Sequence, residues 1–170
     1  MTIVIDVANV MGSRPDGWWR DRAGAAVRLY NEVAELAALG HLLLPSPAEP
    51  GSPEPEPAGD APGETPAPEP AFVMVLEGAA KAAARQLSPP GGTPAHDADL
   101  TSGVAPGEVR VVLAPGSGDD TIVAVARDLP GRRYVVTADR ELQRRCTAAG
   151  AGILGPGWLL GEFRRASADR

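Results

Sequence analysis

Short apolar runs alternate with helical segments along this 170-residue chain, and this alternation limits the possible folds more than any other feature. The runs occupy residues 2–7, 71–78, 108–114 and 133–138. The first two are nearly continuous apolar stretches, which is typical of parallel strands buried on both faces. A fifth strand is a candidate at 151–154. We therefore predict a three-layer α/β fold, in which a central, mostly parallel sheet of four or five strands has helices on both faces.

Helical spacing of apolar residues separates these runs. Apolar side chains recur every three or four positions from about residue 18 to residue 39, and Gly40 is placed to end that helix. Further helices are predicted at 79–86, 118–128, 140–149 and 158–165, and residues 9–17 are predicted to form a loop.

One segment interrupts the pattern. Residues 45–70 hold ten of the 18 prolines and six acidic residues, but no Lys or Arg. Such a segment cannot bury enough apolar surface to offset its ordering entropy, so we predict a disordered Pro/Glu-rich insertion within a single domain spanning 1–170. The alternative is a docking peptide for a protein partner. Residues 88–107 are predicted to be a second, flexible loop.

The net charge and the numbers of cysteine and histidine residues limit the classes of function that the chain can have. The net charge is -6, but outside the insertion 16 acidic residues are balanced by 16 basic ones, so a nucleic-acid substrate is not excluded. With only Cys146, His41 and His96, neither an intrachain disulfide nor a Cys/His metal cluster is expected. We see no signal peptide and no membrane-length apolar run, so we expect a cytoplasmic protein without a membrane partner. A homodimer remains open.

Acidic residues follow four of the predicted strands. Asp6 lies near the end of the first strand, Glu77 ends the second, Asp119 and Asp120 follow the third, and Asp139 follows the fourth. The carboxyl ends of parallel strands share one edge of a sheet, where open α/β folds bind ligands. Carboxylates gathered there repel one another unless a cation is present, and their hard oxygen atoms suit Mg²⁺ or Mn²⁺.

Each acid also has a purely structural interpretation. Asp119, Asp120 and Asp139 precede helices, so any one of them is a candidate N-cap or first-turn charge. Glu77 is alternatively a solvated strand end. Asp6 is the strongest ligand candidate, because it follows apolar residues in a buried strand, where an unpaired carboxylate is costly.

Other chemistries find no support in the sequence. A haloacid-dehalogenase-type phosphatase would have an Asp two residues after Asp6, where this chain has Ala8. The GSGDD segment at 116–120 is not a dinucleotide fingerprint, and no Walker A motif is present. Cys146 lies within a predicted helix without a neighbouring histidine, so we interpret it as a packing residue.

The loop after the first strand, MGSRPDGWWRDR, holds candidates for substrate binding. Its arginines are suited to grip phosphates, and a tryptophan can stack on a base. The alternative is that Trp18 and Trp19 anchor the first long helix onto the sheet. The full set of substrate-binding candidates is Asn9, Ser13, Arg14, Trp18, Trp19, Arg22 and Thr137.

Three segments, IDVANVM, GSGDDTIVAVA and VVTADRELQRRC, resemble the PIN-like superfamily and in particular its NYN-domain branch. The resemblance implies a metal-dependent ribonuclease fold around a parallel sheet. It implies Asp6, Asp119 and Asp139 as metal ligands, with Asn9 beside them and Asp120 as an alternative to Asp119. Glu77 corresponds to an acid at the second strand of some relatives.

The leading hypothesis is therefore a Mg²⁺- or Mn²⁺-dependent nuclease that hydrolyses phosphodiester bonds of RNA. Asp6, Asp119 and Asp139 would hold the metal, Glu77 would assist, and a metal-bound water would attack the phosphorus. One alternative is a nucleoside-triphosphate pyrophosphohydrolase that uses the same acids and closes the Trp/Arg loop over one nucleotide. Another is a catalytically degenerate domain that only binds RNA or a protein.

Overall fold

The sheet predicted from the sequence is present in the computed structural model, which describes residues 1–45, 69–87 and 103–168. Its strands are β1 (Thr2–Asp6), β2 (Ala71–Leu76), β3 (Val109–Leu113), β4 (Arg133–Val136) and β5 (Gly152–Leu154), in the order β3-β2-β1-β4-β5. All four strand pairings are parallel. Most of the insertion predicted at 45–70, and most of the loop predicted at 88–107, lies outside the described residues.

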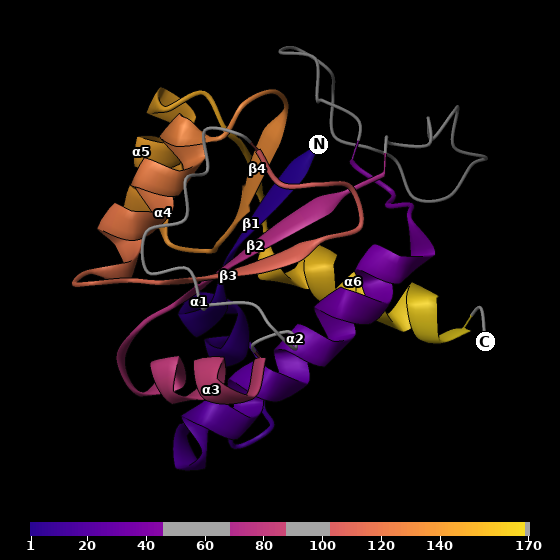
Figure 1. Ribbon diagram of the computed structural model, residues 1–170, viewed down its shortest axis with the longest axis vertical. Coiled ribbons are helices and arrows are strands. Elements are labelled where there is room, and N and C mark those ends of the chain that lie inside the picture. Colours follow the sequence, from indigo (N-terminus) through magenta and orange to yellow (C-terminus); the bar gives the residue numbers. More distant parts are fainter. Residues whose placement is uncertain (46–68, 88–102, 169–170) are drawn as a thin grey trace, which may run out of the picture.

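Helices cover both faces of the sheet, as predicted (Figure 1). One face packs against α1 (Val7–Gly12), α2 (Arg22–Leu39), α3 (Ala84–Leu87) and α6 (Pro156–Ala168). The other face packs against α4 (Gly118–Asp128) and α5 (Arg140–Ala148). Side chains alternate between these two cores along each strand, so that Ile3 and Ile5 of β1 enter the first core and Val4 enters the second.

The predicted loop at 9–17 is wrong in its first part, where α1 begins directly after β1. Asp6 caps this helix by accepting a hydrogen bond from the Asn9 backbone N–H, 3.0 Å away. The segment predicted as one helix from residue 18 consists of a 3-10 turn, η1 (Trp18–Arg20), followed by α2, which Asp21 caps. The helix predicted at 79–86 is a 3-10 helix, η2 (Gly78–Ala83), continued by α3.

The end of α2 and the residues before β2 meet at the edge of the sheet where the strands begin. Gly40 ends α2 in a left-handed conformation, and a Cβ atom placed on it would lie 3.8 Å from Glu69 Cγ. The strand β2 begins two residues after Glu69. Between them, the Pro70 carbonyl accepts a hydrogen bond of 2.9 Å from the N–H of Gly107, which precedes β3. The chain therefore leaves α2 and re-enters the sheet at nearly the same place.

The strand order places a crevice at the opposite edge. From β1 the chain moves to β2 and β3 on one side, then returns to β4 on the other side of β1. The connections that follow β1 and β4 therefore diverge, and the gap between them at the carboxyl ends of the strands is where folds of this kind bind ligands. No helix in the described part of the chain is long and apolar enough to cross a bilayer.

Candidate functional site

An open cleft of about 520 Å³ lies at the carboxyl ends of the strands, and four carboxylates from separate parts of the chain line it. They belong to Asp6, Glu77, Asp119 and Asp139. The structure therefore brings these four acids to one cleft, as the sequence predicts. The volume of the cleft lies within the range of small-molecule sites, about 300–1,000 Å³.

Asp6 is the most buried of the four acids, with 7% of its surface exposed. Its two carboxylate oxygens accept different hydrogen bonds, one from the Asn9 N–H at 3.0 Å and one from the Thr137 hydroxyl at 2.9 Å. Burial raises the pKa of Asp6, the two hydrogen bonds oppose that shift, and the charges of Asp119 and Glu77 add to it. The fold thus fixes a carboxylate whose ionised form gains from any cation that enters the cleft.

Thr137 and Asn9 join the ends of β1 and β4 around Asp6. The Thr137 hydroxyl oxygen also accepts from the Asp139 N–H at 3.2 Å, and the Asn9 side-chain oxygen accepts from the Ala138 N–H at 2.8 Å. Thr137 is fully buried, so its prediction as a substrate-binding residue needs correction, since it holds Asp6 and touches no open surface. Asn9 lines the cleft, as does Ser13.

Asp139 has both of the roles considered for it. It caps α5 by accepting from the Leu142 N–H at 2.8 Å, and it also lines the cleft. Its carboxylate is therefore fixed in direction by the helix that it begins.

Asp119 and Asp120, adjacent in sequence, point in different directions. Ser117 caps α4, and of the two acids only Asp119 lines the cleft. Asp120 is exposed and forms an ion pair of 2.5 Å with Arg145. Burial raises the pKa of Asp119, and the charges of Asp139 and Glu77 raise it further. Of the two alternatives for a metal ligand, Asp119 is the one that faces the other acids.

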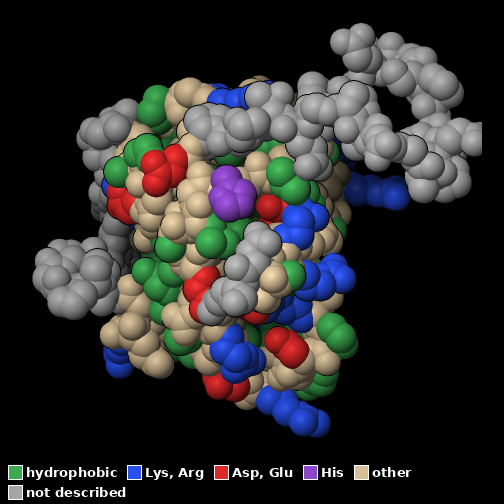
Figure 2. All heavy atoms as spheres, turned by 90° about the vertical axis from the view of Figure 1, so that its right-hand side faces the viewer, with side chains coloured by type: hydrophobic (Ala, Val, Ile, Leu, Met, Phe, Trp, Pro, Cys, Tyr) green, Lys and Arg blue, Asp and Glu red, His purple; other side chains and the backbone are tan. Residues whose placement is uncertain are grey.

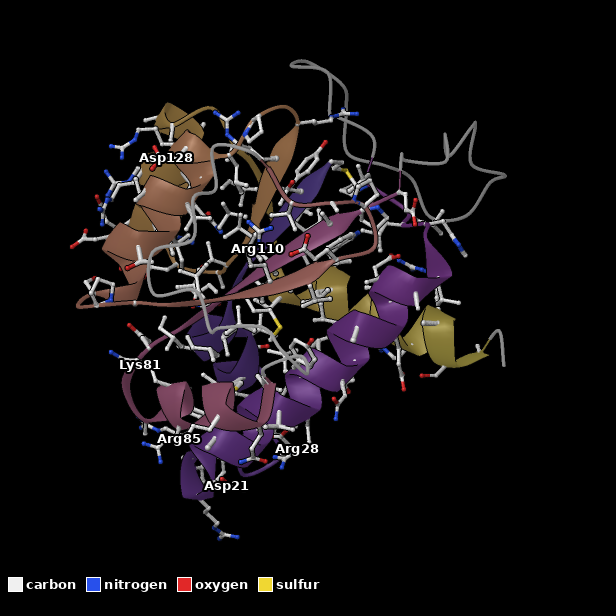
Figure 3. All side chains as sticks on the ribbon, viewed as in Figure 1. Asp21, Arg28, Lys81, Arg85, Arg110 and Asp128 are labelled. Atoms are coloured by element: carbon white, nitrogen blue, oxygen red, sulfur yellow. The ribbon has the colours of Figure 1, made fainter. Side chains whose placement is uncertain are left out.

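Glu77 and Lys81, which follow β2, hold the loop between β3 and α4 in place through hydrogen bonds, and Asp119 lies at the end of this loop, in the first turn of α4. A Glu77 carboxylate oxygen accepts from the Gly118 N–H at 2.9 Å, and the Lys81 ammonium donates to the Ala114 carbonyl at 2.7 Å. Figure 3 shows Lys81 projecting from the segment after β2. A Cβ atom on Gly118 would collide with the Glu77 carboxylate, so glycine is required for this contact. Sequence reasoning missed Lys81 and Gly118; the chain's only lysine was an available signal.

We predict that Gly118→Ala lowers the rate of any reaction catalysed in the cleft by about tenfold or more, because misplacing a reacting group by about 1 Å can cost about 100-fold. The Glu77 hydrogen bond, which contributes about 1 kcal/mol to stability, would be lost. Alanine also lowers the conformational entropy of the unfolded chain, and this offsets about 0.4–1 kcal/mol of the loss. The melting temperature should therefore change little. Gly116→Ala is the matched control, since its Cβ would meet nothing within 4 Å. Equal activity of the two variants would contradict a role for the contact between Glu77 and Gly118 in positioning Asp119.

The Trp/Arg loop is only partly directed at the cleft. Trp18 lines it, and the Arg22 guanidinium lies 5.3 Å from the centre of the Trp18 ring. One prediction needs correction, because Arg14 turns away from the cleft and forms an ion pair of 2.7 Å with Glu32, with its guanidinium over the Phe163 ring. Trp19 lies outside the cleft with 57% of its surface exposed, so its contact with a substrate stays a prediction.

The donor set of the cleft fits a hard cation that keeps part of its water shell. Within the described residues, no group of three or more His, Cys, Asp or Glu side chains is arranged to hold a metal ion. Mg²⁺ commonly binds proteins through one or two carboxylates and retains several waters. Asp6 and Asp119, whose pKa values are raised partly by neighbouring negative charges, are suited to that mode of binding.

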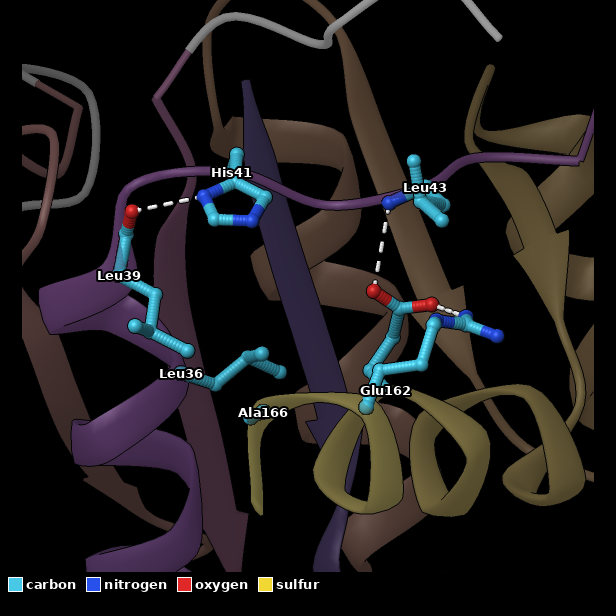
Figure 4. A pocket seen from close by; sticks show the side chains of 7 residues that line it. Leu36, Leu39, His41, Leu43, Glu162 and Ala166 are labelled. Atoms are coloured by element: carbon cyan, nitrogen blue, oxygen red, sulfur yellow. Dashed lines mark hydrogen bonds and ion pairs between the residues drawn. The ribbon is translucent and has the colours of Figure 1, made fainter. Parts of the chain in front are cut away.

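Two other features are structural. Burial raises the pKa of the Cys146 thiol to about 11, in agreement with its interpretation as a packing residue. A smaller hollow of about 120 Å³ lies between the end of α2 and α6, on the face seen in Figure 2. Its carboxylate, Glu162, accepts from the Leu43 N–H and pairs with Arg165, so its charge is already compensated (Figure 4).

The parallel sheet with an acidic cleft at the carboxyl ends of its strands places the protein in the α/β class and is consistent with a PIN/NYN-like fold. The crystal structure of Rae1 (YacP) from Bacillus subtilis, a tryptophan-to-leucine mutant, is similar, with a TM-score of 0.60 and 15% sequence identity over 99% of this chain and 77% of that chain. At this identity the similarity shows a shared fold. The sequence matches no protein-family profile, and no curated protein matches it significantly.

Proposed function

We propose that the protein is a divalent-metal-dependent nuclease that hydrolyses phosphodiester bonds of RNA. The observation that supports this most directly is the convergence of Asp6, Glu77, Asp119 and Asp139 on one open cleft at the topological switch point of a parallel sheet. None of these four carboxylates forms an ion pair among the described residues, although the charge of Arg145 lowers the pKa of Asp119, so the cleft suits neither a small apolar ligand nor an anionic one. They suit a phosphate group that enters together with a divalent cation.

In this proposal Asp6 and Asp119 hold Mg²⁺ or Mn²⁺, and Asp139 completes the acidic wall. A cation bound there would neutralise phosphate charge and lower the pKa of a water molecule. The chain's own contribution is orientation: Asn9 and Thr137 fix both oxygens of Asp6, and the Leu142 N–H fixes Asp139. Glu77, bound to the Gly118 N–H, acts mainly by positioning Asp119.

A nucleoside-triphosphate pyrophosphohydrolase using the same acids is the second candidate, favoured by the single tryptophan on the cleft wall. The purified protein would be given labelled RNA, single-stranded DNA and nucleoside triphosphates with Mn²⁺. Cleavage of RNA supports the proposal. Release of pyrophosphate with RNA left intact would select the hydrolase, and no turnover of any substrate would select a binding domain.

The neighbouring acids of α4 provide a matched pair of variants. We predict that Asp119→Asn lowers RNA cleavage by at least about 10–100-fold, because losing a proposed metal ligand should cost no less than losing a group that only supports one. Asp120→Asn should change it by no more than about twofold, because an exposed ion pair with Arg145 contributes little. Initial cleavage rates measured side by side provide the test, and an equal loss in both variants would contradict the assignment of Asp119.

A further inference from the structure

Trp19 is an exposed aromatic ring placed directly beside the cleft. It is one of only two large hydrophobic residues that are exposed within the described part of the chain, the other being Leu39. Its ring centroid lies 6.3 Å from that of Trp18, which lines the cleft. Trp19 is therefore the neighbour of a residue that lines the cleft, and its ring belongs to neither of the two buried cores.

An arginine accompanies each of the two rings. Arg22 lies 5.3 Å from the Trp18 centroid and Arg20 lies 6.0 Å from the Trp19 centroid. Neither arginine has a carboxylate partner within ion-pair distance among the residues that the structure describes. In each pair the guanidinium lies over one face of the ring, and Trp18 also packs against the core, so the exposed Trp19 ring is the better placed of the two for a nucleobase. The guanidinium of each pair supplies several N–H donors for a phosphate.

The angle between the rings limits what binds there. The two ring planes are 87° apart. Bases stacked on the two tryptophans would therefore be nearly perpendicular, whereas neighbouring bases in a duplex are close to parallel. Only a strand whose bases are splayed apart can use both surfaces, which is the way that proteins recognise unpaired RNA.

We propose that Trp19 and Arg20 form a second nucleotide subsite outside the cleft, which binds an unpaired base and phosphate adjacent to the nucleotide held at Trp18. The inference rests on the proposed function and names its substrate class, a single strand of at least two nucleotides. A mononucleotide seated at Trp18 does not reach this subsite. Trp19-dependent binding therefore separates a protein that binds strands from a hydrolase of mononucleotides, and cleavage in Mn²⁺ then separates a nuclease from a binding domain.

The test is the affinity for a fluorescent single-stranded oligouridylate of eight nucleotides, measured by anisotropy with Ca²⁺ in place of Mn²⁺, so that a hard cation compensates the cleft carboxylates, and with gel analysis to verify that the strand stays intact. We expect Trp19→Ala to weaken binding by about tenfold, Trp19→Phe to keep most of it, and Arg20→Ala to weaken binding and reduce its salt dependence. Binding of uridine monophosphate should not depend on Trp19, and an RNA duplex of equal length should bind the wild type more weakly.

Two matched controls accompany these variants, Leu39→Ala for an exposed apolar side chain and Arg28→Ala for an exposed arginine (Arg28 is labelled in Figure 3). Undetectable binding of the octamer, equal binding by wild type and Trp19→Ala, or equal loss in the Leu39 control would overturn the subsite. So would a self-association of the protein that Trp19→Ala abolishes while RNA affinity stays constant. Trp19-dependent binding without cleavage in Mn²⁺ would preserve the subsite and refute the nuclease.

Discussion

Asp6→Asn is expected to lower RNA cleavage by more than about 100-fold while the protein remains folded. Losing a group that merely supports a metal ligand costs about 10–100-fold in metal affinity or activity, so losing the most buried carboxylate of the cleft should cost more. The free energy of unfolding should not fall in this variant, because burial raises the pKa of Asp6 and the fold therefore disfavours the charged form of this side chain. Single-turnover cleavage rates and thermal melts of the same preparations test both parts.

Asp128→Asn is the control for this substitution, since Asp128 is an exposed aspartate at the end of α4 that pairs with Arg127 (Figure 3). It should retain wild-type activity. RNA cleavage that survives Asp6→Asn would refute the assignment of Asp6 as a metal ligand. An unfolded Asp6→Asn protein would instead mean that Asp6 acts through the hydrogen bonds to Asn9 and Thr137.

The second large effect concerns the stability of the metal-free protein. The pKa values of Asp6 and Asp119 are raised in the folded state, so the folded chain binds protons more tightly than the unfolded chain. The free energy of unfolding therefore falls as pH rises through the acidic range, from the ordinary aspartate pKa to the raised values, and stays lower at neutral pH. A divalent cation in the cleft should restore this lost stability.

We predict that Mn²⁺ at about 100 times its dissociation constant stabilises the protein by about 2.7 kcal/mol at neutral pH. For a chain of this size that raises the melting temperature by about 5–10 °C. The shift should disappear below the ordinary aspartate pKa, where protons compete for the same oxygens, and it should be absent in Asp6→Asn. Differential scanning calorimetry measures it without any RNA, and an equal shift in Asp6→Asn would place the cation elsewhere.

The sequence predicts the sheet well because its strands are local apolar runs. The first run, TIVID, is buried on both faces in the structure, and the parallel direction of the strands places their carboxyl ends together. The parallel direction of the strands is enough to bring Asp6, Glu77, Asp119 and Asp139 to one edge of the sheet. The helix α1 was missed because Asn9, Gly12 and Ser13 resemble loop residues in composition. The spacing from Asp6 to Asn9 is that of a helix cap, and it was the overlooked signal.

What the sequence could not predict depends on contacts between distant segments. Arg14 is directed away from the cleft by Glu32 of α2 and Phe163 of α6. Thr137 is enclosed because its hydroxyl bridges Asp6 and the Asp139 N–H. Neither outcome follows from propensity or periodicity, because each depends on which helices pack together. Composition alone also could not distinguish the cleft-facing Asp119 from Asp120.

The meeting of Gly40 and Glu69 has a consequence for how this chain can diversify. Gly40 at the end of α2 and Glu69 before β2 lie together at the edge of the sheet opposite the acidic cleft. The residues that directly follow Gly40 still belong to the body, since Leu42 is buried and Leu43 is hydrogen-bonded to Glu162 and Trp158 of α6. The cost of closing a loop grows only slowly with its length, so we expect that residues between Pro45 and Glu69 can be gained, lost or replaced with little effect on folding. The geometry of the acidic cleft and the length of the insertion are thereby uncoupled, and the two can evolve independently.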